Sequence, residues 1–395
     1  MKKFYLISLA LSFLFSANIY AQDSTTNSNA HNKSVYSFKT HLGKVIVQYN
    51  YPEKVKLAHI YEFEYGIQTS GNKSWQHDYS FPQMNISALY GDFGSNNILG
   101  QFFAIMPSMS FYNKKHSNIY MEGKFGMGFA YFNKPYNAAT NTDNLYIGSK
   151  ITNITHFSLI VNKRLTPKLI IGGGLSFFHF SNGHIQIPNL GINTPSGQIS
   201  IKYIPQEQTT DFPEREIDKR KGKIRFNIRL GVGMHEYAGS TFPTGGPKYP
   251  IYLGSIYLSK RYNRKNNVHL GFHYNYYSSF YDFMVAQELF LGKQRQYASN
   301  VALFLGHEFI LRHFSFVTQL GGNIYNPFRL KLSKLNQVGK DIKTILTLHI
   351  NTKLGFQYYI FDPKKTTKNN IFLGFFIKAN FGQADFVETA IGYTF

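Results

Sequence analysis

The stretch FVETAIGYTF, residues 386–395, alternates large apolar side chains with small or polar ones and stops at an aromatic residue. In a β-strand, successive side chains point to opposite faces, so alternation of this kind predicts a strand with one apolar face. The apolar members of one parity are Val387, Ile391, Tyr393 and Phe395. A buried final strand of a water-soluble β-protein would show the same alternation.

The same alternation recurs through the chain, and the polar residues that alternate with the apolar ones are informative. Ile224, Phe226 and Ile228 alternate with polar and charged residues, and the segment 266–276 repeats the pattern with His, Gly and Asn. Charges and small residues inside long strands are typical of a membrane barrel with a wet lumen. A terminal strand that ends in an aromatic residue resembles the assembly signal of bacterial outer-membrane barrels. We therefore expect the barrel assembly machinery to be a partner.

Composition supports a membrane barrel over a soluble domain. Aromatic residues make up 17% of the chain and charged residues only 16%, while no later apolar run reaches the length of a membrane helix. The formal net charge of +21 indicates an acidic partner. Nucleic acid is implausible for an exported protein, and phosphorylated lipopolysaccharide fits better. A lysine-rich composition without a specific partner would give the same charge.

The N-terminus predicts export. A positive MKK start, an apolar run over residues 4–15 and a small residue at Ala21 are typical of a secretory signal peptide, predicted over residues 1–21. Residues 22–32 are polar and are predicted to be a disordered leader. Residues 33–395 are then predicted to form a single barrel in the outer membrane of a Gram-negative cell.

The predicted fold is an all-β, transmembrane, antiparallel up-and-down barrel of about 14–16 strands. The connections 133–149, 181–195, 236–249, 280–296 and 323–344 are predicted to be outer loops. Two eight-stranded barrels in tandem are the rival architecture. Sixteen segments qualify as strands: 34–48, 57–69, 84–92, 98–111, 117–132, 150–163, 167–180, 196–206, 223–235, 250–262, 266–279, 297–310, 312–322, 345–361, 369–380 and 384–395.

One stretch carries chemistry: HFSNGHIQIPNLGIN, residues 179–193, which follows a predicted strand. His179 and Ser181 are two residues apart and so share a face, within reach of an imidazole acting on a hydroxyl. Asn182 follows directly and could donate to an oxyanion. Leu175 and Phe177 have the same parity, which places the pair on the lipid side of the barrel, near the outer leaflet.

This stretch resembles the active-site segment of the PagL-type lipid A 3-O-deacylases and their acyloxyacyl-hydrolase-like relatives. The resemblance implies Ser181 as nucleophile, His179 as base and an active-site turn at Pro188, Asn189 and Gly191. The family has a catalytic Glu where this chain has Asn193, and an Asn can orient an imidazole without supplying a full charge.

The resemblance implies an outer-membrane esterase that removes an ester-linked acyl chain from lipid A, with no cofactor. The alternative is a non-catalytic barrel, a porin or structural protein, that retains the family turn. Glu236, at the outer end of its predicted strand, is a candidate replacement for the missing acid. The strand histidines share no ligand spacing, so we predict no metal site.

Overall fold

The computed structural model describes residues 33–47, 55–113, 117–205, 222–237, 239–336, 341–364 and 369–395. The predicted signal peptide and leader lie outside these residues. The strands of the first half are β1 (Lys33–Gly43), β2 (Ala58–Gln68), β3 (Gln83–Asp92), β4 (Gln101–Asn113), β5 (Ile119–Phe132), β6 (Ile151–Arg164), β7 (Leu169–Ser181) and β8 (Ile192–Tyr203). Those of the second half are β9 (Ile224–Glu236), β10 (Lys248–Arg261), β11 (Asn266–Tyr277), β12 (Ser299–Leu311), β13 (Phe314–Tyr325), β14 (Ile350–Tyr359), β15 (Asn370–Asn380) and β16 (Gln383–Thr394). Each overlaps one predicted strand, and the all-β antiparallel fold is confirmed.

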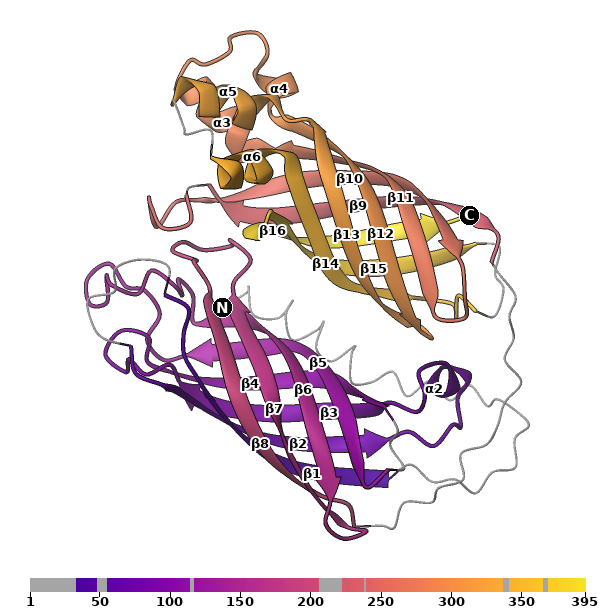
Figure 1. Ribbon diagram of the computed structural model, residues 1–395. Helices are drawn as coiled ribbons and strands as arrows, with labels where there is room; N and C mark the ends of the chain where they lie inside the picture. The colour runs from indigo at the N-terminus through magenta and orange to yellow at the C-terminus, as the bar shows by residue number, and fades with distance from the viewer. Residues whose placement is uncertain are drawn as a thin grey trace, which may run out of the picture. The chain divides into compact units, whose positions relative to one another are not determined.

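The strands close into two barrels of eight, drawn in indigo to magenta and in orange to yellow in Figure 1. In the first barrel β8 returns to β1, with Tyr203 opposite Tyr36. In the second, β16 returns to β9, with Val387 opposite Met234. The prediction of one continuous barrel over residues 33–395 is therefore wrong, and the tandem architecture is correct.

The physical reason lies in the interiors. Eight strands enclose a space that side chains alone can fill, and the first lumen is filled by charges that compensate one another. Glu64 accepts from Lys39 at 2.9 Å, and neither side chain is exposed to solvent. We name this set of buried, paired side chains the lumen ion network: Lys39, Glu62, Glu64, Glu122, Lys124 and Lys202. The expectation of a wet lumen is therefore wrong for this barrel.

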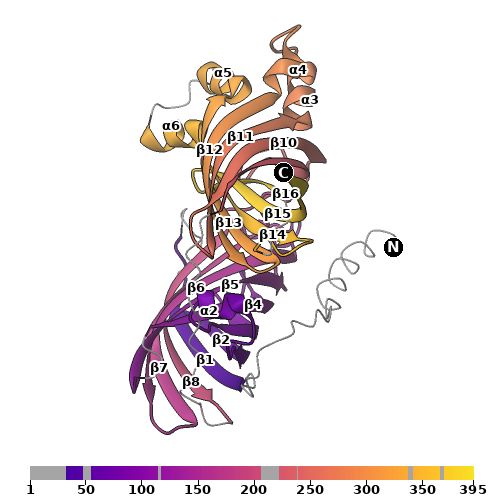
Figure 2. The same cartoon turned by 90° about the vertical axis from the view of Figure 1, so that its right-hand side faces the viewer.

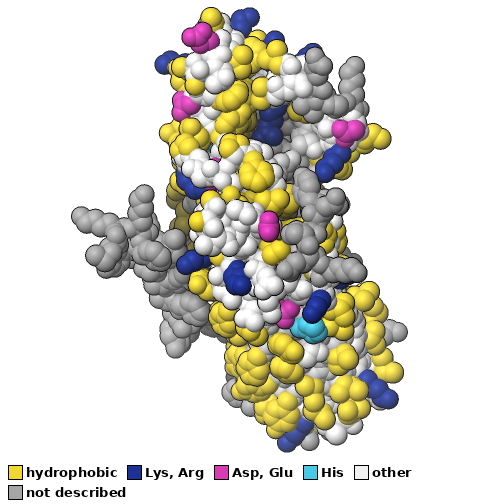
Figure 3. Space-filling model, turned by 90° about the vertical axis from the view of Figure 1, so that its left-hand side faces the viewer, with side chains coloured by type: hydrophobic (Ala, Val, Ile, Leu, Met, Phe, Trp, Pro, Cys, Tyr) yellow, Lys and Arg dark blue, Asp and Glu magenta, His cyan; other side chains and the backbone are white. Residues whose placement is uncertain are grey.

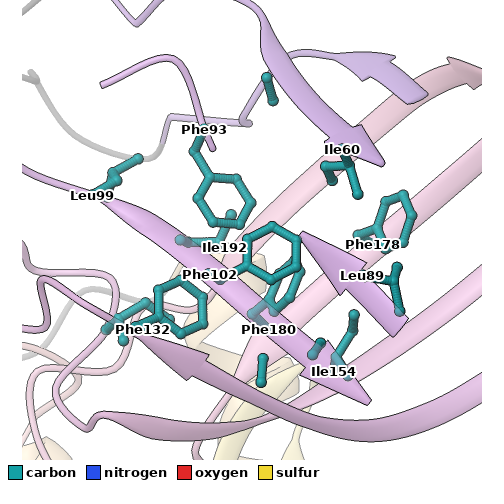
Figure 4. Close-up of a cluster of buried hydrophobic side chains, with 14 of the residues drawn as sticks. Ile60, Leu89, Phe93, Leu99, Phe102, Phe132, Ile154, Phe178, Phe180 and Ile192 are labelled. Atoms are coloured by element: carbon teal, nitrogen blue, oxygen red, sulfur yellow. The ribbon is translucent and has the colours of Figure 1, made fainter. Parts of the chain in front are cut away.

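Toward the end of the first barrel that carries Ser181, the lumen is closed by aromatic rings (Figure 4). The phenylalanine cluster consists of Phe93, Phe102, Phe132 and Phe180. Phe180 packs edge-on against Phe102 with ring centroids 4.8 Å apart. Phe180 lies between His179 and Ser181 in sequence but points inward, so the cluster fixes β7 from the lumen side while its neighbours face outward.

The outward faces are apolar. Leu175 and Ile199 are each 72% exposed, whereas Ile170 and Phe178, of the opposite parity on β7, are fully buried. Figure 3 shows one face of the molecule, on which hydrophobic side chains are dense and charges are sparse. An exterior of this kind suits the hydrocarbon core of a membrane. None of the helices in the described ranges is long and apolar enough to cross a membrane.

Several connections contain helices that the sequence reading gave as loops or strand. The first barrel has α2 (Ser74–Asp78); the second has α3 (Ser278–Ala286), α4 (Gln294–Tyr297), α5 (Pro327–Leu335) and α6 (Ile342–His349), gathered at one end of that barrel in Figure 2. Residues 345–349 were predicted as strand and are helical. Phe280, Met284 and Phe328 bury their side chains in one cluster, which holds α3 and α5 on the barrel end.

Candidate active site

The pairing of β7 with β8 places His179 directly opposite Asn193. The His179 Nδ1 and Asn193 Oδ1 atoms are 2.8 Å apart. An amide oxygen can only accept a hydrogen bond, so Nδ1 carries the proton in this arrangement. In the neutral ring, the other nitrogen, Nε2, then keeps its lone pair, which is the state a general base requires.

Parity along β7 gives the direction in which this pair faces. His179 shares the outward face with Leu175 and Phe177, and Asn193 shares it with Pro195 on β8. His179 is half-buried, whereas Phe178 and Phe180 on either side of it point into the lumen. The prediction that the histidine faces the lipid side of the barrel is confirmed.

Ser181 is the last residue of β7 and is 6% exposed. Its Oγ accepts hydrogen bonds from Asn189 Nδ2 at 2.9 Å and from the backbone N–H of Gly183 at 3.1 Å. Within the described residues no hydrogen bond joins Ser181 to His179. Catalytic hydrogen bonds are often long or unformed without substrate, so this geometry does not disfavour the pair.

Gly191 brings the two side chains into one site. It has a left-handed φ of 73°. A Cβ placed there would lie 3.3 Å from His179 Cε1 and 3.7 Å from Ser181 Cβ, with the Phe180 carbonyl at 3.0 Å. The backbone at Gly191 therefore lies against the side chains of both His179 and Ser181, and any larger residue would be strained and crowded.

The predicted active-site turn is held by a neighbouring loop. Gly191 N donates to Tyr146 O at 3.1 Å, and Leu190 N donates to Leu145 O at 3.2 Å. A Cβ at Gly148 would lie 2.5 Å from Pro188 O, so the loop backbone approaches the turn closely. These contacts fix the turn against the loop that carries Leu145, Tyr146 and Gly148.

Asn182 uses its side chain inside the turn. Its Nδ2 donates to Gln186 O at 2.7 Å and to Ser149 Oγ at 3.2 Å, and its Oδ1 accepts from His184 N at 3.0 Å. Both amide hydrogens are therefore engaged away from Ser181. Asn189, which the sequence reading gave only as a turn residue, instead donates to Ser181 and accepts from Asn182 N at 3.1 Å.

Glu236, the candidate substitute acid, braces the turn and does not reach the imidazole. Its Oε2 accepts from Ile187 N at 3.2 Å and from Lys248 Nζ at 2.6 Å, and its Oε1 accepts from Gly246 N at 2.8 Å. The orienting partner of His179 is thus Asn193. Nothing in the spacing of residues 179–193 marks Asn189 as a donor to Ser181; only the folded turn does.

Comparisons with known proteins agree with the two-barrel division. Residues 59–202 match the family model of lipid A 3-O-deacylase (PagL), and residues 224–395 match that of the acyloxyacyl hydrolase C-terminal domain. The second match begins at the first residue of β9. No curated protein is significantly similar to the chain.

Similar solved structures include two bacterial barrels. The β domain of the Bordetella autotransporter BrkA is 9% identical with a TM-score of 0.25, over 93% of this chain and 99% of that one. Acinetobacter baumannii OccAB3 is 10% identical with a TM-score of 0.21, over 92% and 98%. Together the two matches span the chain, which belongs to the PagL family, with its first barrel matching lipid A 3-O-deacylase and its second matching the acyloxyacyl hydrolase C-terminal domain.

Proposed function

We propose that this protein hydrolyses an ester-linked acyl chain of lipid A with Ser181 as nucleophile and His179 as general base. The observation that carries the proposal is the His179–Asn193 hydrogen bond of 2.8 Å, which leaves Nε2 unprotonated on the face that Ser181 shares. The pair stands at the end of a strand whose outward side chains are apolar. A nucleophile there meets the ester without drawing the lipid out of the membrane.

In the first step, Ser181 Oγ attacks the ester carbonyl carbon and its proton passes to His179 Nε2. The carbonyl oxygen becomes an oxyanion beside Gly183 N–H and Asn189 Nδ2, which already converge on Oγ. Donors that already lie beside the reacting atoms stabilise the developing negative charge and so lower the barrier.

The intermediate then collapses. The ester C–O bond breaks, the sugar oxygen leaves and takes the proton from His179 Nε2, and the acyl group remains on Ser181. Water attacks this acyl-enzyme with His179 again as base, which releases the fatty acid and restores the serine. Asn193 keeps the ring in one tautomer through both halves of the reaction.

Asn193 supplies orientation without charge. A carboxylate in its place would also stabilise the imidazolium that forms when Ser181 loses its proton. The missing charge is the one observation that favours the alternative, a non-catalytic barrel with a relic turn. A porin, by contrast, needs an open lumen, and the first barrel is filled by the lumen ion network and the phenylalanine cluster.

The test is release of fatty acid from purified lipid A by the protein in detergent, followed by mass spectrometry of both products. The expected result is a lipid A that lacks one ester-linked acyl chain with the parent protein and intact lipid A with Ser181→Ala. Release that continues at the parent rate with Ser181→Ala would contradict the mechanism, and no release by the parent would support the non-catalytic barrel.

Two partners follow from this function. The substrate is the phosphorylated lipid of the outer leaflet, whose negative charge suits a chain of net charge +21. The barrel assembly machinery is expected to recognise β16, whose outward-facing Ile391 is 55% exposed.

A further inference from the structure

We propose that the outer surface of β7, β8 and β1 beside the reactive pair holds the acyl chain of the ester being cleaved. Two glycines, Gly197 and Gly173, set how long that chain can be. The inference rests on the function proposed above, because it assigns the path of the chain whose carbonyl carbon reacts with Ser181.

The strand register gives this surface a direction. From the His179–Asn193 pair toward the middle of the strands, the outward cross-strand pairs are Phe177 with Pro195, Leu175 with Gly197, and Gly173 with Ile199. A strand rises about 3.3 Å per residue, so Gly197 lies about 13 Å from Asn193 and Gly173 about 20 Å from His179. Each position along β7 and β8 therefore corresponds to a known distance from the ester along the bound acyl chain.

A groove runs over the nearer of these positions. It has a volume of about 880 Å³, and its lining includes Phe177, Leu175, Pro195, Gly197 and Leu42. Gly197 pairs with Leu175 on one side and with Leu42 on the other. Those leucines are 72% and 50% exposed, so they stand as walls above a floor made by the Gly197 backbone.

A second groove of about 490 Å³ lies at the next step along the strands, over Gly173, Ile171, Ile199 and Phe38. Each of the last two cross-strand pairs therefore contains one glycine beside a large apolar residue. The two hollows follow each other in the direction in which a chain attached at Ser181 would extend into the membrane.

The packing of the barrel does not require these two glycines. A Cβ at Gly197 would meet no atom within 4 Å, and one at Gly173 would meet only Gln198 O at 3.9 Å. The neighbouring Gly174 differs, because a Cβ there would lie 2.0 Å from Leu159 O. Glycine weakens a strand interior, so these two positions are not explained by the packing of the barrel. What marks these two glycines is that each lies in the floor of a groove.

Hydrocarbon is the occupant that this surface suits. The walls are aliphatic and aromatic, and the surface faces the membrane. The groove begins at Phe177 and Pro195, the outward pair next to His179 and Asn193. Since lipid tails are as apolar as leucine, the groove gains little from hydrophobic transfer and acts through packing and alignment. It should therefore select acyl chains by length and fit, with moderate effects on rate.

The experiment uses the full chain in detergent and a graded series of glucosamine lipids that differ only in the length of one saturated ester-linked acyl chain. Gly197→Val and Gly173→Val each fill one hollow at a different distance from Ser181. Gly322→Val is the matched control, because Gly322 lies on the outward face of β13 and a Cβ there also meets no atom within 4 Å.

With Gly197→Val, hydrolysis of the long chains is expected to fall about tenfold relative to the shortest, the size typical of a methylene misfit in an apolar site. Gly173→Val should also lower hydrolysis of long chains, but only of chains longer than those that Gly197→Val affects. Gly322→Val should keep the parent profile. Gly197→Ala, which adds a single methyl group, should give a smaller shift and guards against loss of folding.

Failure of the groove and failure of the proposed function are distinguishable. If the parent releases fatty acid in a Ser181-dependent way but both glycine variants keep its chain-length profile, the groove proposal is wrong and the mechanism stands. The same holds if the two variants set the same length limit. If the parent shows no Ser181-dependent release, the proposed function fails and this inference falls with it.

Discussion

His179 and Asn193 are cross-strand partners on β7 and β8, joined side chain to side chain at 2.8 Å on the outward face of the first barrel. The register alone makes this pair, since the ten-residue turn 182–191 returns β8 to the same level of the sheet. A glutamate at position 193 would occupy the same level, which explains how the family's acid can be replaced without moving the histidine.

Asn193→Ala is therefore expected to lower the rate of fatty acid release, because the imidazole loses its fixed tautomer, and Asn193→Glu is expected to raise it. The gain should be about tenfold or less, since the rim is partly wet and charge effects there are weak. Initial rates on purified lipid A for all three side chains decide the matter. Equal rates for Asn and Ala would make Asn193 a turn residue only.

Ser181→Ala and His179→Ala are each expected to reduce release by about a thousandfold or more, as for members of a catalytic unit. Both residues lie at the end of a strand, so heat-modifiable migration of the folded barrel should be unchanged. A variant that fails to assemble would instead mark its residue as structural.

Much of the fold was predictable because a strand can be recognised from the alternation of its own residues. The alternation of Tyr61 and Phe63 with Glu62 and Glu64 is visible in the sequence, and the structure places the first pair outward and the second in the lumen. Barrel closure is different: the pairing that places Tyr36 opposite Tyr203 is made by backbone groups and joins segments far apart in the chain. Alternation in the sequence indicates how many strands there are, but it does not indicate which strands pair to close a barrel.

Helix α6 shows a second limit of prediction from the sequence. Leu346, Leu348 and Ile350 alternate as in a strand, yet residues 342–349 are helical. A cap was present in the sequence: Asp341 accepts from Thr344 N at 3.0 Å, the pattern of an N-cap aspartate. Prediction of the site from the sequence had the same limit, because only the folded turn brings Asn189 next to Ser181.

Asn189→Ala is expected to lower kcat about a hundredfold or more, with little change in KM, because it removes a donor that converges on Ser181 Oγ. Asn189→Asp tests the same point with an almost identical shape, since a carboxylate cannot donate. Rates for both variants should fall together. An Asp variant with parent activity would contradict a donor role for Asn189.

Asn182→Ala provides the comparison for that measurement. Asn182 braces the turn through Gln186 and Ser149, so its loss should lower the thermal midpoint or increase protease cleavage within the turn. Any rate loss should be partly recovered at lower temperature. A kcat loss as large as that of Asn189→Ala, with an intact turn, would return the oxyanion role to Asn182.

Planar-bilayer recordings of the purified protein are expected to show no steady channel through the first barrel. Its lumen holds the buried lumen ion network and, toward the site, the phenylalanine cluster, so ions have no continuous water path there. Phe102→Ala with Phe180→Ala would open only the cluster and should still not conduct. A stable conductance with the parent would favour the porin alternative.

Glu62→Ala is expected to destabilise the first barrel strongly. Glu62 carries no solvent exposure and is paired with Lys124 and with His41, whose Nε2 lies 3.2 Å away. Its loss leaves buried cations with one compensating charge fewer, and breaking a buried pair in this way costs about 3–5 kcal/mol.

Urea unfolding of the protein in detergent should show an earlier transition with Glu62→Ala. Glu288→Ala, in the exposed loop after α3, is the control and should shift it little. A double variant, Glu62→Ala with Lys124→Met, should recover part of the loss because it removes the orphaned charge as well. If Glu62→Ala alone unfolds at the parent midpoint, water reaches the lumen and the ion pairs do not hold the barrel closed.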